Sequence, residues 1–133
     1  MRLATLLLGT ALALGGCTGD TQLGATREAR AQRDLADALK DRVAGAPTDC
    51  ISATHVDGPQ IIDGRTLLYR DAGRVWKADL VDACPGLDPY DTIVVELHGS
   101  QLCRNDPFRT VTPGLSIPSG ICRFRRFVPY DRP

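Results

Sequence analysis

The chain has few aromatic residues, no excess of charge of either sign and no hydrophobic run long enough to cross a membrane. Phe, Trp and Tyr make up 5% of its 133 residues, and 16 basic side chains balance 16 acidic ones. The apolar run from Leu3 to Gly16 is shorter than the about 20 residues that a membrane-spanning helix needs. These absences exclude a multi-pass membrane protein and a strongly basic nucleic-acid-binding protein, and the length excludes a second full-sized domain.

Motifs for catalysis are also missing, because the sequence contains no G-x-S-x-G, no H-E-x-x-H and no glycine-rich phosphate loop. His98 lies two residues from Glu96, in the pattern of a weak metal site or an acid–base pair, but ordinary polar residues at an exposed strand end explain it better. His55, Ser52 and Asp57 are the residue types of a hydrolytic triad. A triad is defined by the roles of its members in space, however, and three residues of one short extended segment are not expected to meet in that way. We therefore expect a protein that is not an enzyme and that uses neither a metal nor a cofactor.

The N-terminus has the layout of a bacterial export signal. Arg2 supplies a positive charge, an apolar run rich in Leu and Ala follows, and small residues lead to Cys17. The segment Leu14-Gly15-Gly16-Cys17 resembles the lipobox of bacterial lipoproteins, in which the cysteine receives the lipid. The resemblance implies that residues 1–16 are a signal peptide removed by cleavage and that acyl chains on Cys17 anchor the protein. Ordinary soluble secretion is the alternative.

The residue after the cysteine bears on the choice of membrane. Thr18 stands where an aspartate often signals retention in the inner membrane of enteric bacteria. The resemblance therefore favours an anchor in the outer membrane, with the domain in the periplasm. The membrane is thus an expected partner through the lipid.

The chain contains five cysteines, so one lipidated cysteine leaves an even set. Cys50, Cys84, Cys103 and Cys122 would then pair as disulfides in an oxidising compartment. A structural zinc site is disfavoured because the intervals contain no C-x-x-C pair. Of the three pairings we favour Cys84 with Cys103, which closes a loop around one strand, and Cys50 with Cys122, which joins the first and last segments of the domain.

Residues 26–45 are expected to form a spacer helix after a flexible leader over residues 17–25. Apolar residues recur there every four residues, at Ala31, Leu35, Leu39 and Val43. Gly45 and Pro47 then supply a stop signal. So narrow an apolar stripe fits either a spacer that docks a partner or a helix that packs on its own domain.

Residues 48–133 consist of short extended runs separated by turn residues. Asp63-Gly64 separates two such runs, which is typical of a hairpin, and Ala72-Gly73 comes before the run Arg74–Leu80. Regularly spaced strands with turn signals predict a mainly β fold. We expect a small antiparallel sheet of five or six strands, curled into a barrel or roll and preceded by one N-terminal helix.

The alternation of apolar and polar residues is interrupted in the last extended run, residues 121–128. Cys122 and Phe124 share one face, but the next apolar position is Phe127 and not a residue two positions further on. This slip predicts a β-bulge at Arg125-Arg126.

Cysteines and turn residues also carry a family resemblance, in Cys50-Ile51, Cys84-Pro85-Gly86-Leu87, Leu102-Cys103 and Cys122-x-Phe124. Over roughly residues 49–130 the chain resembles a family of small, uncharacterised exported proteobacterial proteins that contain disulfides. The resemblance implies an exported, disulfide-stapled and β-rich domain. No activity is attached to that family, so no functional residue can be carried over from it.

Charge is unevenly distributed along the chain. Residues 49–103 carry nine acids and four bases, whereas residues 104–133 carry two acids and six bases. Arg123, Arg125 and Arg126 form the densest cluster, and guanidinium groups bind carboxylates and phosphates through paired hydrogen bonds. The cluster could bind an anionic glycan, an anionic lipid or an acidic envelope protein, or it could balance an acidic neighbour within the domain.

Together these features predict a small lipid-anchored cell-envelope protein with a structural or binding role. Nucleic acid is not among the expected partners. The alternative is an inhibitor of an extracytoplasmic hydrolase, such as a lysozyme or a protease. Such an inhibitor would present the loop Thr112–Gly120 to the cleft of the enzyme.

Overall fold

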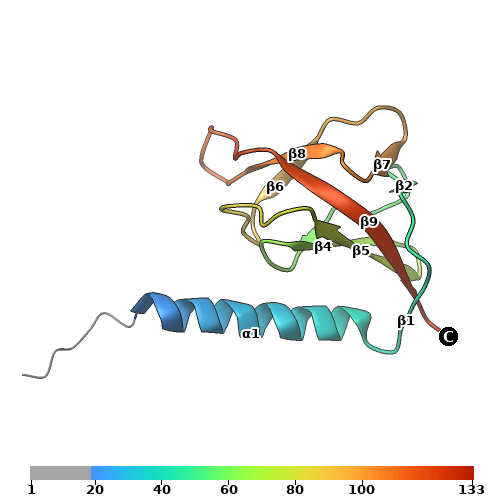
Figure 1. Cartoon of the computed structure of the whole chain (residues 1–133), viewed down its shortest axis with the longest axis horizontal. Helices are drawn as coiled ribbons and strands as arrows, with labels where there is room; N and C mark the ends of the chain where they lie inside the picture. Colours follow the sequence, from blue (N-terminus) through green and yellow to red (C-terminus); the bar gives the residue numbers. More distant parts are fainter. Residues whose placement is uncertain (1–18) are drawn as a thin grey trace, which may run out of the picture.

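A computed structural model describes residues 19–133 of the chain. A 21-residue helix lies along one face of a curled antiparallel sheet that forms a half-barrel (Figure 1). The predicted mainly β fold with one N-terminal helix is confirmed. The elements are α1 (Gly19–Leu39), β1 (Val43–Ala44), β2 (Cys50–Ser52), β3 (Gln60–Ile61), β4 (Thr66–Asp71), β5 (Arg74–Leu80), β6 (Thr92–Val95), β7 (Gln101–Cys103), β8 (Pro107–Val111) and β9 (Cys122–Asp131).

The long strand β9 organises the sheet. The strand order is β3-β4-β5-β9-β8-β6, and β1 adds to the C-terminal part of β9. β9 pairs with β8 through its first residues and with β5 along most of its length, so it joins both halves of the curl (Figure 1). β2 and β7 form a separate two-stranded sheet. The turn at Asp63-Gly64 connects β3 to β4, as predicted, and Ala72-Gly73 connects β4 to β5.

Alternation along the strands creates two apolar layers. On β5, Trp76, Ala78 and Leu80 point into the half-barrel, where Phe108, Phe124 and Phe127 are fully or almost fully buried. Val75 lies on the opposite face of the sheet and packs toward the helix. A sheet with one inner and one outer apolar face needs a cover on each side. The helix supplies the outer cover.

The helix packs on its own domain. Ala31 is 7% exposed, and together with Leu35 it contacts a layer that contains Leu68 and Val75 of the sheet. The helix was expected over residues 26–45 but spans Gly19–Leu39, so residues 19–25 are helical and not a flexible leader. It ends before Gly45 because Asp41 adopts a left-handed φ of 57° and the chain turns into β1. Residues 1–18, which include Cys17, lie outside the described residues.

The four predicted cysteines form two disulfides, but the favoured pairing is wrong. Cys50 bonds to Cys103 and Cys84 bonds to Cys122. Cys50 and Cys103 lie directly opposite each other on β2 and β7. Cys84 follows β5, and the end of β5 pairs with β9 beside Cys122. The prediction failed because the pairings that bring the cysteines together, β2 with β7 and β5 with β9, join strands that are distant in sequence.

Candidate functional site

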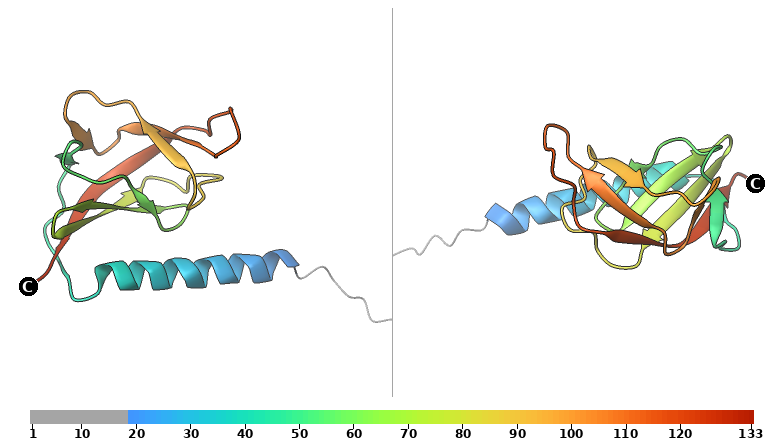
Figure 2. Two further views of the ribbon diagram at one scale, coloured as in Figure 1. Left: turned by 180° about the vertical axis from the view of Figure 1, so that it is seen from behind. Right: turned by 90° about the horizontal axis from the view of Figure 1, so that it is seen from above.

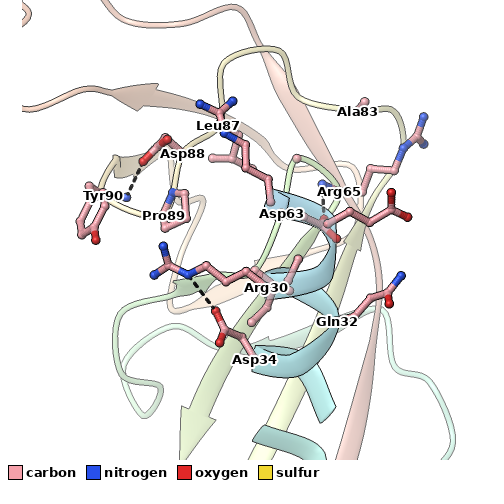
Figure 3. Close-up of a pocket in the computed structure, with 15 residues that line it drawn as sticks. Arg30, Gln32, Asp34, Asp63, Arg65, Ala83, Leu87, Asp88, Pro89 and Tyr90 are labelled. Atoms are coloured by element: carbon pink, nitrogen blue, oxygen red, sulfur yellow. Dashed lines mark hydrogen bonds and ion pairs between the residues drawn. The ribbon is translucent and has the colours of Figure 1, made fainter. Parts of the chain in front are cut away.

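A cleft of about 580 Å³ opens between the helix and the half-barrel. One wall is α1, the floor is the turn between β3 and β4, and the other wall is the loop that follows β5 (Figure 3). Ala31 and Ile62, both buried, form its apolar base. Its polar rim consists of Arg27, Glu28, Arg30, Gln32, Asp34, Asp63, Arg65, Asp88 and Tyr90.

Short-range contacts hold the rim in shape. The Arg30 guanidinium lies 3.5 Å from the Asp34 carboxylate one helical turn away. Asp63 accepts a hydrogen bond of 2.7 Å from the backbone N–H of Arg65 and thereby closes the turn. In the facing loop, Asp88 accepts a bond of 3.2 Å from the backbone N–H of Tyr90, as Figure 3 shows. Loop and turn are thus ordered by local bonds that leave several rim side chains facing the cleft.

The electrostatics of the cleft are mixed. The adjacent Tyr90 phenol and then the Asp34 carboxylate raise the pKa of the Arg30 guanidinium, so this group remains a cation. The side chains of Arg27 and Arg65 form no hydrogen bond or ion pair with another residue of the part that the structure describes. Their donors are available to an acceptor that enters the cleft. Because acids alternate with these bases, the cleft suits a ligand that carries charges of both signs.

A second, apolar pocket of about 270 Å³ lies beside β6 and β7. Ile93, Val95 and Leu102 line it together with residues of the loop 53–59. Tyr69 also lines it, and this residue is only 4% exposed. Its Oη atom is buried without a hydrogen-bond partner, and burial raises the pKa of the phenol. The hydroxyl is therefore a strongly perturbed group of the core.

The predicted arginine cluster makes contacts within the domain. Arg126 donates a hydrogen bond of 2.9 Å to Asp49, whose carboxylate also lies 3.7 Å from Arg104. Arg125 donates bonds of 3.0 Å to the carbonyls of Leu80, the last residue of β5, and of Val81, which follows it. These contacts support the interpretation that the cluster balances its own domain.

Arg123 differs from the rest of the cluster in its place. It donates one bond of 2.8 Å to the carbonyl of Asn105 and is otherwise exposed. It lies at the base of the loop between β8 and β9, on the sheet face opposite to Cys122 and Phe124. Arg123 therefore keeps guanidinium donors for an external anion, and it makes no ion pair within residues 19–133, whereas the charge of Arg126 faces Asp49.

Neither His98 nor His55 forms the side-chain contact within the described residues that its sequence pattern suggested. His98 and Glu96 are both exposed beyond the end of β6, and no hydrogen bond joins them among the bonds of the described chain. The Ser52 hydroxyl lies 3.1 Å from the Thr54 hydroxyl and not against His55. Within residues 19–133 no three His, Cys, Asp or Glu side chains are grouped to hold a metal ion.

One loop presents apolar side chains to solvent. Leu115 is 62% exposed and Ile117 is 83% exposed, on the connection between β8 and β9. The sequence suggested this loop as an inhibitory segment, and the structure places its tip on the surface. Sequence reasoning missed the cleft, because its walls come from segments about 25–60 residues apart that only the docking of the helix brings together. The sequence feature that pointed toward the cleft was the apolar stripe of the helix, in which Ala31 proves to be buried.

No helix in residues 19–133 is long and apolar enough to span a membrane. Comparisons with protein-family models, with curated proteins and with solved structures found no match to this chain.

Proposed function

We propose that this chain is a lipid-anchored protein of the bacterial cell envelope whose folded domain acts by binding and not by catalysis. The observation that supports it best is the complete pairing of the four cysteines that remain after Cys17. Disulfides persist outside the reducing cytoplasm. The fifth cysteine, Cys17, lies at a lipobox-like site, where it would carry the lipid and need no disulfide partner. The resemblance to exported proteobacterial proteins is consistent with this location.

The cleft between α1 and the loop after β5 is the proposed binding site. Arg27 and Arg65 offer guanidinium donors, while Glu28 and Asp88 offer carboxylate acceptors on the same rim. A peptide segment of another envelope protein carries both kinds of group and could bond to both. The rim is ordered by local hydrogen bonds before any ligand arrives, which reduces the entropy lost on binding.

The location is tested by mass spectrometry of the protein extracted from membranes. We expect a mature chain that begins at Cys17 and carries acyl groups, and we expect Cys17→Ser to release the protein into the soluble periplasmic fraction. A membrane-extracted chain that begins at Met1, or that carries an unmodified Cys17, would contradict the anchor.

The binding site is tested by crosslinking in living cells. A photo-crosslinking amino acid at Gln32, on the rim of the cleft, is expected to capture a discrete envelope protein. The same group at Lys40, exposed beyond the other end of the helix, is the matched control and should capture nothing specific. Equal capture from both positions, or none from either, would argue against the cleft.

The exposed loop between β8 and β9 supports a second candidate function, inhibition of an extracytoplasmic hydrolase. Leu115 and Ile117 project from a loop whose base is held by hydrogen bonds of Ser119. Co-purification of a lysozyme or a protease with the tagged domain, abolished by Ile117→Asp, would favour inhibition.

A further inference from the structure

The segment of residues 112–121 between β8 and β9, here called the apolar loop, combines exposed hydrophobic side chains with a complete lack of charge. Leu115, Ile117 and Ile121 are 62%, 83% and 56% exposed. No residue from Thr110 to Cys122 is charged, and the first charged residues on either side are both arginines, Arg109 and Arg123. Single exposed apolar residues are common, but such a cluster marks a contact surface.

The apolar loop is held away from the core. Ser119 accepts a hydrogen bond of 2.8 Å from the backbone N–H of Thr110, and its own N–H donates one of 2.8 Å to the Thr110 carbonyl. Arg109 donates a further bond of 3.2 Å to the Ser119 carbonyl. These bonds fasten one leg of the loop to β8, while the tip at Leu115 and Ile117 stays in solvent.

The apolar loop lies at the same end of the molecule as the start of α1. In all three views the loop, at the orange-to-red end of β8, lies toward the same end of the molecule as the first turn of α1 (Figures 1 and 2). The C-terminus and β1 lie at the opposite end. Leu23, in the first turns of the helix, is 60% exposed, and Tyr90, in the loop after β5, is 73% exposed.

Covalent geometry places the proposed anchor at this same end. Cys17 precedes Gly19, the first residue of α1, by two residues. Two residues of extended chain span at most about 7 Å. Acyl chains on Cys17 would therefore enter the membrane close to the start of the helix. With the helix docked on its own sheet, the domain cannot stand off from the bilayer on a long flexible spacer.

We propose that the end of the molecule that carries the apolar loop lies against the phospholipid bilayer, with Leu115 and Ile117 inserted among the acyl chains. Arg109 and Arg123 then face lipid phosphates, because each has guanidinium donors beyond the one bond it makes within the domain. Apolar tips flanked by cationic side chains are suited to the boundary between acyl chains and headgroups. The inference rests on the proposed lipid anchor and adds a defined orientation to it.

A bilayer fits these observations better than the cleft of a hydrolase. Because the proposed anchor at Cys17 precedes the helix by only two residues, the end of the molecule that carries the apolar loop would lie toward the membrane. An enzyme that bound this loop would have to enter between the domain and the membrane. Leu23 belongs to the first turns of α1, which lie at the same end of the molecule, and it is exposed although it lies outside the apolar loop. A planar apolar partner explains this and a narrow cleft does not.

The experiment places an environment-sensitive fluorophore on a new cysteine in the full lipidated protein. If Cys17 is thioether-linked and the other four cysteines are paired, the thiol of Ile117→Cys is the only reactive one. The matched control is Val43→Cys, because Val43 is 63% exposed and lies in β1 at the opposite end. Each labelled protein is reconstituted with vesicles of phosphatidylethanolamine and phosphatidylglycerol that contain a nitroxide-labelled lipid.

We expect the fluorophore at position 117 to shift to the blue, to brighten several-fold and to be quenched by the nitroxide, while the fluorophore at position 43 stays unchanged. Equal, water-like emission from both positions on protein that is lipidated and bound to vesicles overturns the inference and leaves the anchor intact. A response at position 117 to an added lysozyme or protease but not to vesicles also overturns it, in favour of inhibition. Protein that carries no lipid overturns the anchor, and the proposed orientation with it.

Discussion

Phe124 and Phe127 pack against each other in the core with ring centroids 5.7 Å apart, although they lie three residues apart on one strand. In a regular strand, an odd separation would place one of the two rings on the outer face. The pairing between β5 and β9 shifts here: Ala78 opposes Phe127, and Leu80 opposes Phe124. One residue of β5 therefore faces two of β9, Arg125 and Arg126, and this bulge lets both rings point inward.

Deleting Arg126 should therefore be tolerated far better than deleting Arg123. Without Arg126 the strand loses the extra residue of the bulge, so Phe124 and Phe127 stand two positions apart and still share the inner face. Without Arg123, Cys122 and Phe124 become adjacent, and one buried side chain must leave the core. We expect a loss of about 3–5 kcal/mol in the free energy of unfolding for the second deletion, as for removal of a core aromatic side chain. Deletion of Arg126 also removes an exposed ion pair with Asp49 and should cost about 1 kcal/mol or less. Urea unfolding measures both, and equal losses would contradict the bulge.

Local patterns predicted local features of this fold well. The bulge and the hairpin at Asp63-Gly64 were both evident in the sequence, because each depends on a few adjacent residues. The disulfide pairing was not, since it depends on the strand order of the whole sheet. The start of the helix was missed because Gly24 lowers helix propensity, yet it lies within α1. The cleft requires the docked helix and could not be foreseen from any single segment.

The pairing of the cysteines is itself a prediction for the protein in solution. Peptide mapping under non-reducing conditions should recover Cys50 joined to Cys103 and Cys84 joined to Cys122. Replacing Cys84 and Cys122 together with alanine frees a segment of 38 residues in the unfolded chain. The chain-entropy model then gives a loss of about 2–4 kcal/mol in the free energy of unfolding. A peptide that joins Cys84 to Cys103 would refute the observed topology.

The buried hydroxyl of Tyr69 leads us to expect a substitution that does not destabilise the fold. Its buried Oη has no hydrogen-bond partner, so the folded state carries the desolvation cost of a hydroxyl without compensation. Tyr69→Phe removes that atom and keeps the ring, which packs edge-on against Phe124 at 6.3 Å. We expect the free energy of unfolding at neutral pH to stay equal or to rise by about 1 kcal/mol. A loss above that size in chemical denaturation would reveal a bonded hydroxyl.

The same residue predicts sensitivity to alkali. Burial raises the pKa of the Tyr69 phenol in the folded state above its ordinary value of 10.0. The unfolded chain thus releases this proton first, so stability that is fully present below pH 10 falls as the pH rises beyond it. Tyr69→Phe should remove this part of the alkaline decline, whereas Tyr130→Phe, which leaves Tyr69 in place, should not. Unfolding measured in denaturant from pH 8 to pH 11.5 distinguishes them.

At acid pH the ion pair of Arg74 and Asp131 should lose its contribution. Arg74 donates bonds of 2.7 and 2.8 Å to the two carboxylate oxygens, and these bonds lower the pKa of Asp131 in the folded state. A lowered folded pKa gives stability that is present above the ordinary pKa of 3.8 and is lost as the pH falls through the folded value. The difference in stability between the native chain and Asp131→Asn should therefore shrink below about pH 4. A difference that does not change with pH would contradict the pairing.

Docking of the helix is the condition for both the cleft and the proposed orientation, and one pair of substitutions isolates it. Leu35 packs against the apolar layer that contains Ala31, Leu68 and Val75, whereas its neighbour Ala36 is exposed. Leu35→Asp places a charge in that layer and should release the helix, while Ala36→Asp should leave it docked. Amide hydrogen exchange over residues 19–39 then accelerates in the first variant alone, because an isolated helix of this length is marginal in water. The exchange of β9 should stay slow in both, since its core partners lie on the other face of the sheet. Fast exchange over residues 19–39 in the native chain would show that the helix is not held against the sheet, and the cleft would then lose one wall.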